Sequence, residues 1–374
     1  MTLSFFFNFS KYLTIILIFL LACKVFAWDS LGFNTHMAIT DDAIKLINEA
    51  EYPDLIRFKN QIKYGSNSES HNSHQTDTRN SDNLNGGYPR AFWDAGKTDS
   101  GRADNAVFYY NFGEFTRCYF YFGKICHLIS DMAVPAHAAN ILHGKKPFYF
   151  DNFETAADEN YVFGELKPFK KNKDPEYYFK VMKKATYKNI KKHKWINEKE
   201  KMPYWLIDGD KNEKDSRGEY GGEYYLDIFD YTGKGAKNII ESQITLAINF
   251  TAGALMSMSE KLPARTSNIT IEKSKDGYKI SFEVQENRKP MVKIWISVDD
   301  KKNKCIRCEN YSPKDKYMLE PGNEMPWEKV FEFYWDGKLH NGKYIMPGEH
   351  RISITVIDED KNISQEAVKI FTSY

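Results

Sequence analysis

The stretch His127-Leu-Ile-Ser-Asp131-Met-Ala-Val-Pro135-Ala-His137 carries the strongest structural signal in the chain. His127 and Asp131 are four residues apart, so their side chains lie on the same face of a helix. Pro135 interrupts the helical pattern before His137, because proline lacks the backbone donor that a helix interior needs. Imidazole and carboxylate groups are natural ligands for zinc. This stretch therefore predicts a helix that ends in a metal site.

Apolar residues continue at helical spacing on both sides of this stretch, up to about residue 262. A further helix is expected to begin at His36, with Thr35 as its N-terminal cap. Other helices are expected over residues 104–132, 175–193 and 236–262. The stretch 66–87 is rich in Ser, Asn, His and Asp, and its composition predicts a long loop.

The hydrophobic period changes to two after Pro263, which is typical of strands. Alternation predicts strands at 268–272, 278–284, 292–298, 350–358 and 367–372. We therefore predict a multidomain α plus β chain. An all-α domain is expected over residues 28–264, followed by an Ig-like β-sandwich over 265–374.

Residues 1–27 have the features of a secretory signal peptide. An apolar run at 12–22 is followed by a small-residue cleavage site ending at Ala27, which would leave Trp28 as the first residue of a secreted protein. The alternative is lipid attachment at Cys23, because Leu20-Leu-Ala-Cys23 resembles a bacterial lipobox. That alternative predicts a protein anchored at the cell surface, with Trp28 inside the chain.

The charges almost cancel, with a net charge of +1, so no specific nucleic-acid binding is expected. Cys118 and Cys126 are eight apart on one predicted helix, too far to form a disulfide, and are expected to be buried thiols. Cys305 and Cys308 have no second pair nearby to complete a zinc ribbon, so a local disulfide is expected in an exported protein.

Six of the nine histidines lie between residues 36 and 143, among several acidic residues. These histidines are His36, His71, His74, His127, His137 and His143, and the acids include Glu69, Asp77, Asp131, Asp151 and Glu154. This density of imidazole and carboxylate groups predicts a metal centre.

Four features together resemble the bacterial zinc-dependent phospholipase C family, which includes the catalytic domain of clostridial alpha-toxin. They are Trp28, Thr35-His36, Tyr64-Gly-Ser-Asn-Ser-Glu69, and the block His127-xxx-Asp131-xxx-Pro135-x-His137. The resemblance covers about residues 28–262. The block also resembles that of fungal and plant single-strand nucleases, so it identifies a superfamily better than a substrate. Separately, the segment 335–352 resembles the Ig-like domain of flagellar hook-capping proteins, which implies a fold and not a function.

The resemblance implies an α-helical zinc hydrolase domain with up to three zinc ions. The α-amine and carbonyl of Trp28 would bind one zinc ion together with His36 and Asp131. Asp131 would bridge to a second ion, which His127 and Glu69 also hold. His137 would bind the third ion with a pair of ligands near Glu154.

Two positions depart from the family pattern by lacking a histidine. Ala91 stands where the family has histidine before an aromatic-aromatic-Asp segment, and His71 or His74 are candidates to replace it. Phe150 stands where the family has the histidine of a His-xxx-Glu pair that would end at Glu154.

The nearest candidates to replace the histidine at Phe150 are Asp151 and His143. A third departure concerns Glu69, which stands where the family more often has aspartate and is one methylene longer.

The implied activity is hydrolysis of a phosphodiester, with phospholipid cleaved to diacylglycerol and a phosphorylated headgroup. Zinc would activate water, Asp131 would hold two ions, and Glu69 is the candidate to orient or deprotonate the water. Contact with a membrane surface is expected for such a substrate. One alternative is a zinc-dependent nuclease or 3′-nucleotidase with the same metal core. The other is a surface binding protein with a degenerate metal site, and the missing histidines at Ala91 and Phe150 motivate it.

Overall fold

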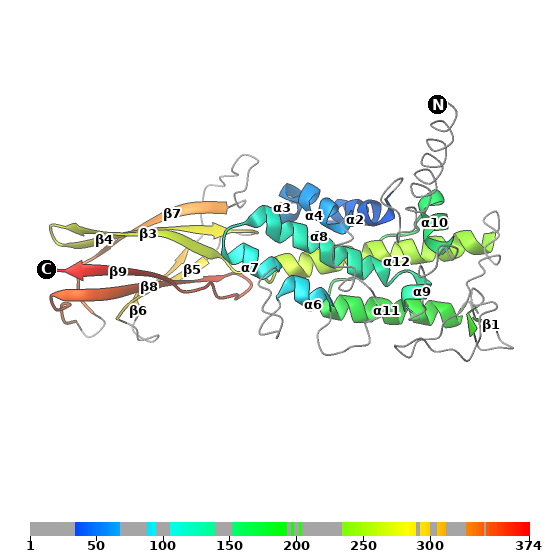
Figure 1. The fold of residues 1–374 in the computed structure, drawn as a ribbon. Helices are drawn as coiled ribbons and strands as arrows, with labels where there is room; N and C mark the ends of the chain where they lie inside the picture. The colour runs from blue at the N-terminus through cyan, green and yellow to red at the C-terminus, as the bar shows by residue number, and fades with distance from the viewer. Residues whose placement is uncertain are drawn as a thin grey trace, which may run out of the picture.

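The helices gather at one end of an elongated molecule and most of the strands at the other (Figure 1). The computed structural model describes residues 34–67, 88–94, 105–138, 152–192, 196–197, 202–203, 234–288, 292–299, 305–311, 327–339 and 342–374. Within these residues the helices are α2 (Thr35–Lys45), α3 (Pro53–Arg57), α4 (Lys59–Asn67), α6 (Tyr88–Trp93), α7 (Ala106–Asn111), α8 (Phe115–Asp131), α9 (Pro135–Ala138), α10 (Asn152–Glu159), α11 (Pro175–Lys192) and α12 (Lys234–Ser259).

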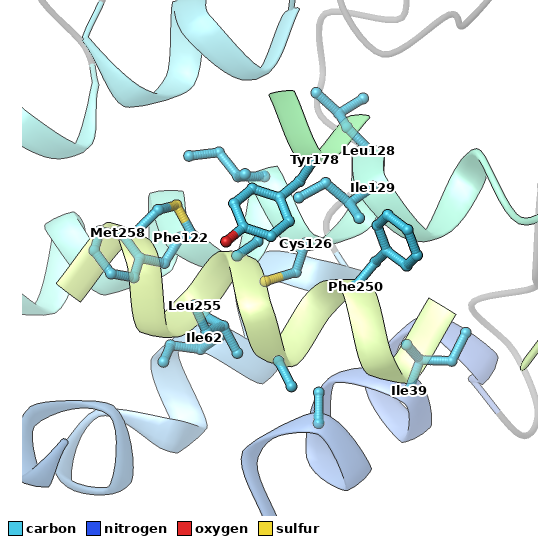
Figure 2. Close-up of a cluster of buried hydrophobic side chains, with 14 of the residues drawn as sticks. Ile39, Ile62, Phe122, Cys126, Leu128, Ile129, Tyr178, Phe250, Leu255 and Met258 are labelled. Carbon is cyan, nitrogen blue, oxygen red and sulfur yellow. The ribbon is translucent and has the colours of Figure 1, made fainter. Parts of the chain in front are cut away.

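Helix α8 is central to the helical region, because it packs against α2, α4, α6, α7, α11 and α12. Its buried side chains Phe122 and Cys126 meet Leu255 of α12 and Tyr178 of α11 in the core (Figure 2). Burying each large apolar side chain stabilises the fold by about 1.5–3 kcal/mol. Cys118 and Cys126 are buried free thiols, as predicted.

Helix α12 contains the stretch Asn238–Ser259, which is long and apolar enough to cross a membrane. Within the protein, 67% of its most apolar window is buried. Ile244, Ile248 and Leu255 of this stretch belong to the hydrophobic core that α8 also lines. We therefore assign α12 as a core helix of the helical region.

The strands of the C-terminal region form two small antiparallel sheets, with the orders β3-β4-β7 and β6-β5-β8-β9. Their bounds are β3 (Arg265–Ser274), β4 (Gly277–Glu286), β5 (Val292–Val298), β6 (Cys305–Tyr311), β7 (Trp327–Trp335), β8 (Gly348–Asp358) and β9 (Ala367–Ser373). Buried side chains of both sheets, such as Phe282 and Ile294, share one apolar core. The five strands expected from alternation are confirmed by β3, β4, β5, β8 and β9.

The predicted fold class, an all-α domain followed by an Ig-like β-sandwich, is wrong. The chain mixes helix and strand, since β1 (Ile196–Asn197) pairs antiparallel with β2 (Met202–Pro203) inside the part expected to be all helical. Strands of two residues are too short to leave an alternating pattern. The C-terminal region is rich in strand, but its strands divide into small sheets of three and four, a division that periodicity alone does not specify.

A buried polar junction joins the helical and strand regions at Asp54 of α3. Its Oδ2 accepts hydrogen bonds from the Tyr119 hydroxyl at 2.7 Å, the Ser259 hydroxyl at 2.7 Å and the Asn287 amide at 3.2 Å. Burial raises the pKa of Asp54, although these three donors favour the ionised form. Because Tyr119 lies on α8 and Asn287 follows β4, one carboxyl group connects the central helix with the sheets.

Replacing Asp54 tests the strength of this junction. In Asp54→Ala, three buried donors lose their acceptor, and each such loss costs about 1–3 kcal/mol. We expect the free energy of unfolding in urea to fall by roughly 3 kcal/mol or more. Glu49→Ala, at an exposed acid, is the control and is expected to stay within about 0.5 kcal/mol of the parent. A change that small in Asp54→Ala would contradict the role given to the junction.

Candidate metal centre

His36 enters the centre from the first turn of α2. The Asn34 side chain accepts a hydrogen bond from the Met37 amide at 2.9 Å and so caps the helix, where sequence analysis had expected Thr35 to be the cap. The Thr35 hydroxyl instead donates to Asp158 of α10. Buried Ile39 and Ala43 pack the rest of α2 into the core. These contacts fix the helix end that carries His36.

His127 and Asp131 lie on the last turns of α8, which ends at Asp131, one residue before the predicted end. The single helix expected over 104–132 is divided into α7 and α8 between Asn111 and Phe115. The Nε2 atom of His36 is 3.3 Å from Oδ1 of Asp131, and Nε2 of His127 is 3.5 Å from Oδ2. The two imidazole rings stack with centroids 4.0 Å apart. All three residues are buried, and one candidate ligand atom from each lies within 4.8 Å of the others. This group could hold a metal ion.

The backbone of Ser66 sets the tautomer of His127. Nδ1 of His127 is 2.9 Å from the Ser66 carbonyl oxygen, which can only accept, so Nδ1 carries the proton and donates. In a neutral imidazole the other nitrogen then has a free electron pair. In its neutral form, His127 therefore presents the electron pair of Nε2 toward Asp131, as a metal ligand must.

Ser130 contacts Nδ1 of His36 through its hydroxyl oxygen at 2.6 Å. When the Ser130 hydroxyl donates its single proton to the His127 carbonyl at 2.9 Å, its oxygen accepts a hydrogen bond from Nδ1 of His36. Nε2 of His36 is left with an electron pair that also faces Asp131.

The electrostatics of the centre favour a cation. Burial, followed by the proximity of His127 and His137, lowers the pKa of His36 well below its usual value, so the ring is neutral at pH 7. An ionised Asp131 offers only acceptor oxygens. Two imidazole electron pairs and a carboxylate thus converge in a buried space, and a metal ion matches this donor set.

Two glycines bring α4 close enough to α8 to build this arrangement. A Cβ atom at Gly123 would lie 2.0 Å from the Ile62 carbonyl oxygen, and one at Gly65 would lie 1.9 Å from that of Phe120. The two backbones are therefore in direct contact. This contact places the Ser66 carbonyl, one residue beyond Gly65, against His127.

His137 is buried on α9, which begins at Pro135 after the expected break. It is close enough to lower the pKa of His36 but is not part of the group formed by His36, His127 and Asp131. Glu154 lies on α10 one turn before Asp158, although its side chain is outside the described residues. Trp28, Glu69, His71, His74 and Asp151 also lie outside the described residues, as do His143 and Phe150.

Sequence analysis missed Ser66 and Ser130, the two residues that orient the imidazoles. Ser130 directly precedes Asp131, and its position three residues after His127 gave a signal, since a serine hydroxyl on a helix can reach back one turn to a carbonyl. Ser66 acts through its backbone, and residue type gives no signal for such a contact.

No protein-family model, curated protein or solved structure matches the chain. The candidate metal centre is therefore supported by its own geometry. The resemblance to zinc-dependent phospholipases C stays a prediction.

Removing the Ser130 hydroxyl is expected to weaken metal binding. In Ser130→Ala, His36 loses the acceptor that fixes its tautomer, and loss of such a partner typically costs about 10- to 100-fold in metal affinity. Zinc titration against a competing chelator measures this change. Ser257→Ala removes an equally buried hydroxyl that contacts Tyr178, and metal affinity should not change in that control. Equal losses in the two variants would contradict the role of Ser130.

Adding a methyl group at Gly123 is expected to separate α4 from α8. Overpacking of this kind costs about 1–3 kcal/mol of stability, and it would move the Ser66 carbonyl away from His127. Gly123→Ala should therefore lower both the thermal midpoint and the zinc affinity. At Gly253, a Cβ atom would lie 1.8 Å from the Phe169 carbonyl oxygen. Gly253→Ala should thus destabilise the fold while the protein that remains folded binds zinc normally.

Proposed function

We propose that the protein is a secreted zinc-dependent phosphodiester hydrolase of the phospholipase C class. The observation that supports this proposal best is the convergence of two buried imidazoles on the buried carboxyl group of Asp131. Neutral histidine and carboxylate are the usual ligands of catalytic zinc, which keeps at least one position open to water or substrate. The order of His127, Asp131 and His137 in the sequence, which resembles that family, adds independent support.

The remaining ligands of the proposed site come from the same resemblance. Trp28 and Glu69 would complete the coordination around Asp131, and His71 or His74 would compensate for Ala91. His137 would hold a third ion with Glu154 and Asp151. The bond between Thr35 and Asp158 is consistent with this set, because it ties α10 to the first turn of α2, next to His36.

The residues of the centre would divide the work of hydrolysis. Zinc held there supplies Lewis acidity, which lowers the pKa of water and offsets charge on the phosphate oxygens. Ser66 and Ser130 keep both imidazoles in the tautomer that presents Nε2 to Asp131. Burial of the three side chains keeps bulk water from their electron pairs. Glu69 would orient the attacking water or accept its proton.

Phospholipid is the substrate that we favour over nucleic acid. The net charge of +1 gives the chain little general attraction for a polyanionic backbone. A phospholipid substrate does not require a basic surface of this kind, because a single phosphodiester reaches the centre at a time. For phosphatidylcholine the products would be diacylglycerol and phosphocholine.

The proposal is tested by hydrolysis of phosphatidylcholine vesicles, with zinc removed by a chelator and then restored. We expect release of phosphocholine that stops on chelation and returns with zinc. Asp131→Asn should lower kcat/KM by roughly 10³-fold or more, because it weakens the ligand that both imidazoles face. His350→Gln, at a histidine on β8, should retain full activity.

Three outcomes would contradict the proposal. Cleavage of single-stranded nucleic acid without cleavage of phospholipid would assign the protein to the nucleases. Bound zinc without hydrolysis of either substrate would favour a binding protein. Full activity in Asp131→Asn would remove the proposed centre from the reaction.

A further inference from the structure

Six aromatic rings form a continuous cluster along α6, α7 and α8, which lie beside one another (Figure 1). We call it the aromatic cluster, and it consists of Phe92, Phe108, Tyr109, Phe112, Phe120 and Tyr121. The ring centroids of Phe112 and Phe108 are 4.6 Å apart, and those of Phe108 and Tyr109 are 5.4 Å apart. The Tyr121 centroid lies 5.4 Å from that of Tyr109. It also lies 5.9 Å from the Phe92 centroid and 6.2 Å from the Phe120 centroid.

Two cationic side chains lie over these rings. The Lys124 ammonium is 5.3 Å from the centroids of Phe92 and Tyr121 and 5.5 Å from that of Phe120. The Arg117 guanidinium is 5.3 Å from the Tyr109 centroid and 2.9 Å from the Glu114 carboxylate, and its side chain is 62% exposed. Glu114 offsets one of the two cations, so the cluster combines aromatic area with a local excess of one positive charge among these three residues.

The aromatic cluster is only partly covered by the protein. Phe92 is buried at its base, Phe108, Tyr109, Phe120 and Tyr121 are half-buried, and Phe112 is 65% exposed. A single exposed apolar residue is common on protein surfaces, but Phe112 stands at the open end of a continuous group of rings with two cations over it.

The spacing along α8 links this surface to the metal centre. Arg117, Lys124 and Asp131 follow one another at intervals of seven residues, as do Phe120 and His127. Residues seven apart lie on nearly the same face of a helix. The face of α8 that carries the metal ligands at its end therefore carries Arg117, Phe120 and Lys124 over the preceding turns.

We propose that the aromatic cluster is the surface by which the protein docks on a phospholipid bilayer, with α8 lying along the membrane. This inference rests on the proposed function, since a phospholipase must meet its substrate in an aggregated surface. Rings of Phe and Tyr partition into the headgroup region of a bilayer, where they bury apolar area and keep polar groups wet. Arg117 and Lys124 complement the lipid phosphates, and the Lys124 stem allows its ammonium to leave the rings for a phosphate.

The test is co-sedimentation with vesicles of phosphatidylcholine and phosphatidylglycerol in the presence of chelator, so that binding is measured without hydrolysis. Phe112→Ser should weaken partitioning by about fivefold or more, because it removes apolar area from the interface. Arg117→Gln should weaken it and reduce its dependence on salt. Tyr344→Ser is the matched control, because Tyr344 has the same 65% exposure and a lysine over its ring but lies between β7 and β8.

A short-chain phospholipid below its aggregation concentration separates docking from catalysis. Phe112→Ser should hydrolyse this soluble substrate at the rate of the parent, so a failure of the proposed function leaves the docking result interpretable. Equal vesicle binding by Phe112→Ser and the parent would overturn the inference. An equal loss in Tyr344→Ser would do so too, as would a Phe112→Ser defect confined to single-stranded oligonucleotide binding.

Discussion

The backbone contact between Gly65 and Gly123 is the constraint on which the metal centre depends. It sets the separation of α4 and α8 at a value that no side chain at either position would allow. At this separation the Ser66 carbonyl reaches His127, and the histidine is fixed in one tautomer before any ligand arrives. The orientation of the imidazole is therefore a consequence of helix packing, and the free energy needed to order the site is supplied by the fold.

Helix α8 connects this centre with the rest of the molecule. Near its beginning Tyr119 binds Asp54, which also contacts α12 and the residue that follows β4. At its end Asp131 faces both imidazoles. The same helix thus contacts the junction with the sheets and carries two residues of the centre.

The sequence predicted the parts of this structure that depend on local pattern. The helical spacing of His127 and Asp131, the break at Pro135 and five alternating strands were all evident in it. It did not predict the pair β1 and β2, which is too short to show a period. It also did not predict β6, where Cys305 and Cys308 were expected to form a local disulfide, or β7, whose exposed Val330 and Tyr334 obscure the alternation. The convergence of His36 with residues far along the chain required tertiary contacts. So did the roles of Ser66 and Ser130, which depend on which carbonyl or hydroxyl a ring nitrogen meets.

The junction at Asp54 has a consequence for how this chain can change in evolution. A strand region joined to its neighbour through an apolar surface could be exchanged or lost as an independent module. Here Asn287 donates to Asp54 and to Ser259, and Arg288 pairs with Glu260 at the end of α12. Loss of the sheets would remove one of the three donors to Oδ2 of Asp54 and the Arg288 partner of Glu260. A substitution on one side of this junction therefore alters the hydrogen bonding of the other side, which favours matched changes in the two regions.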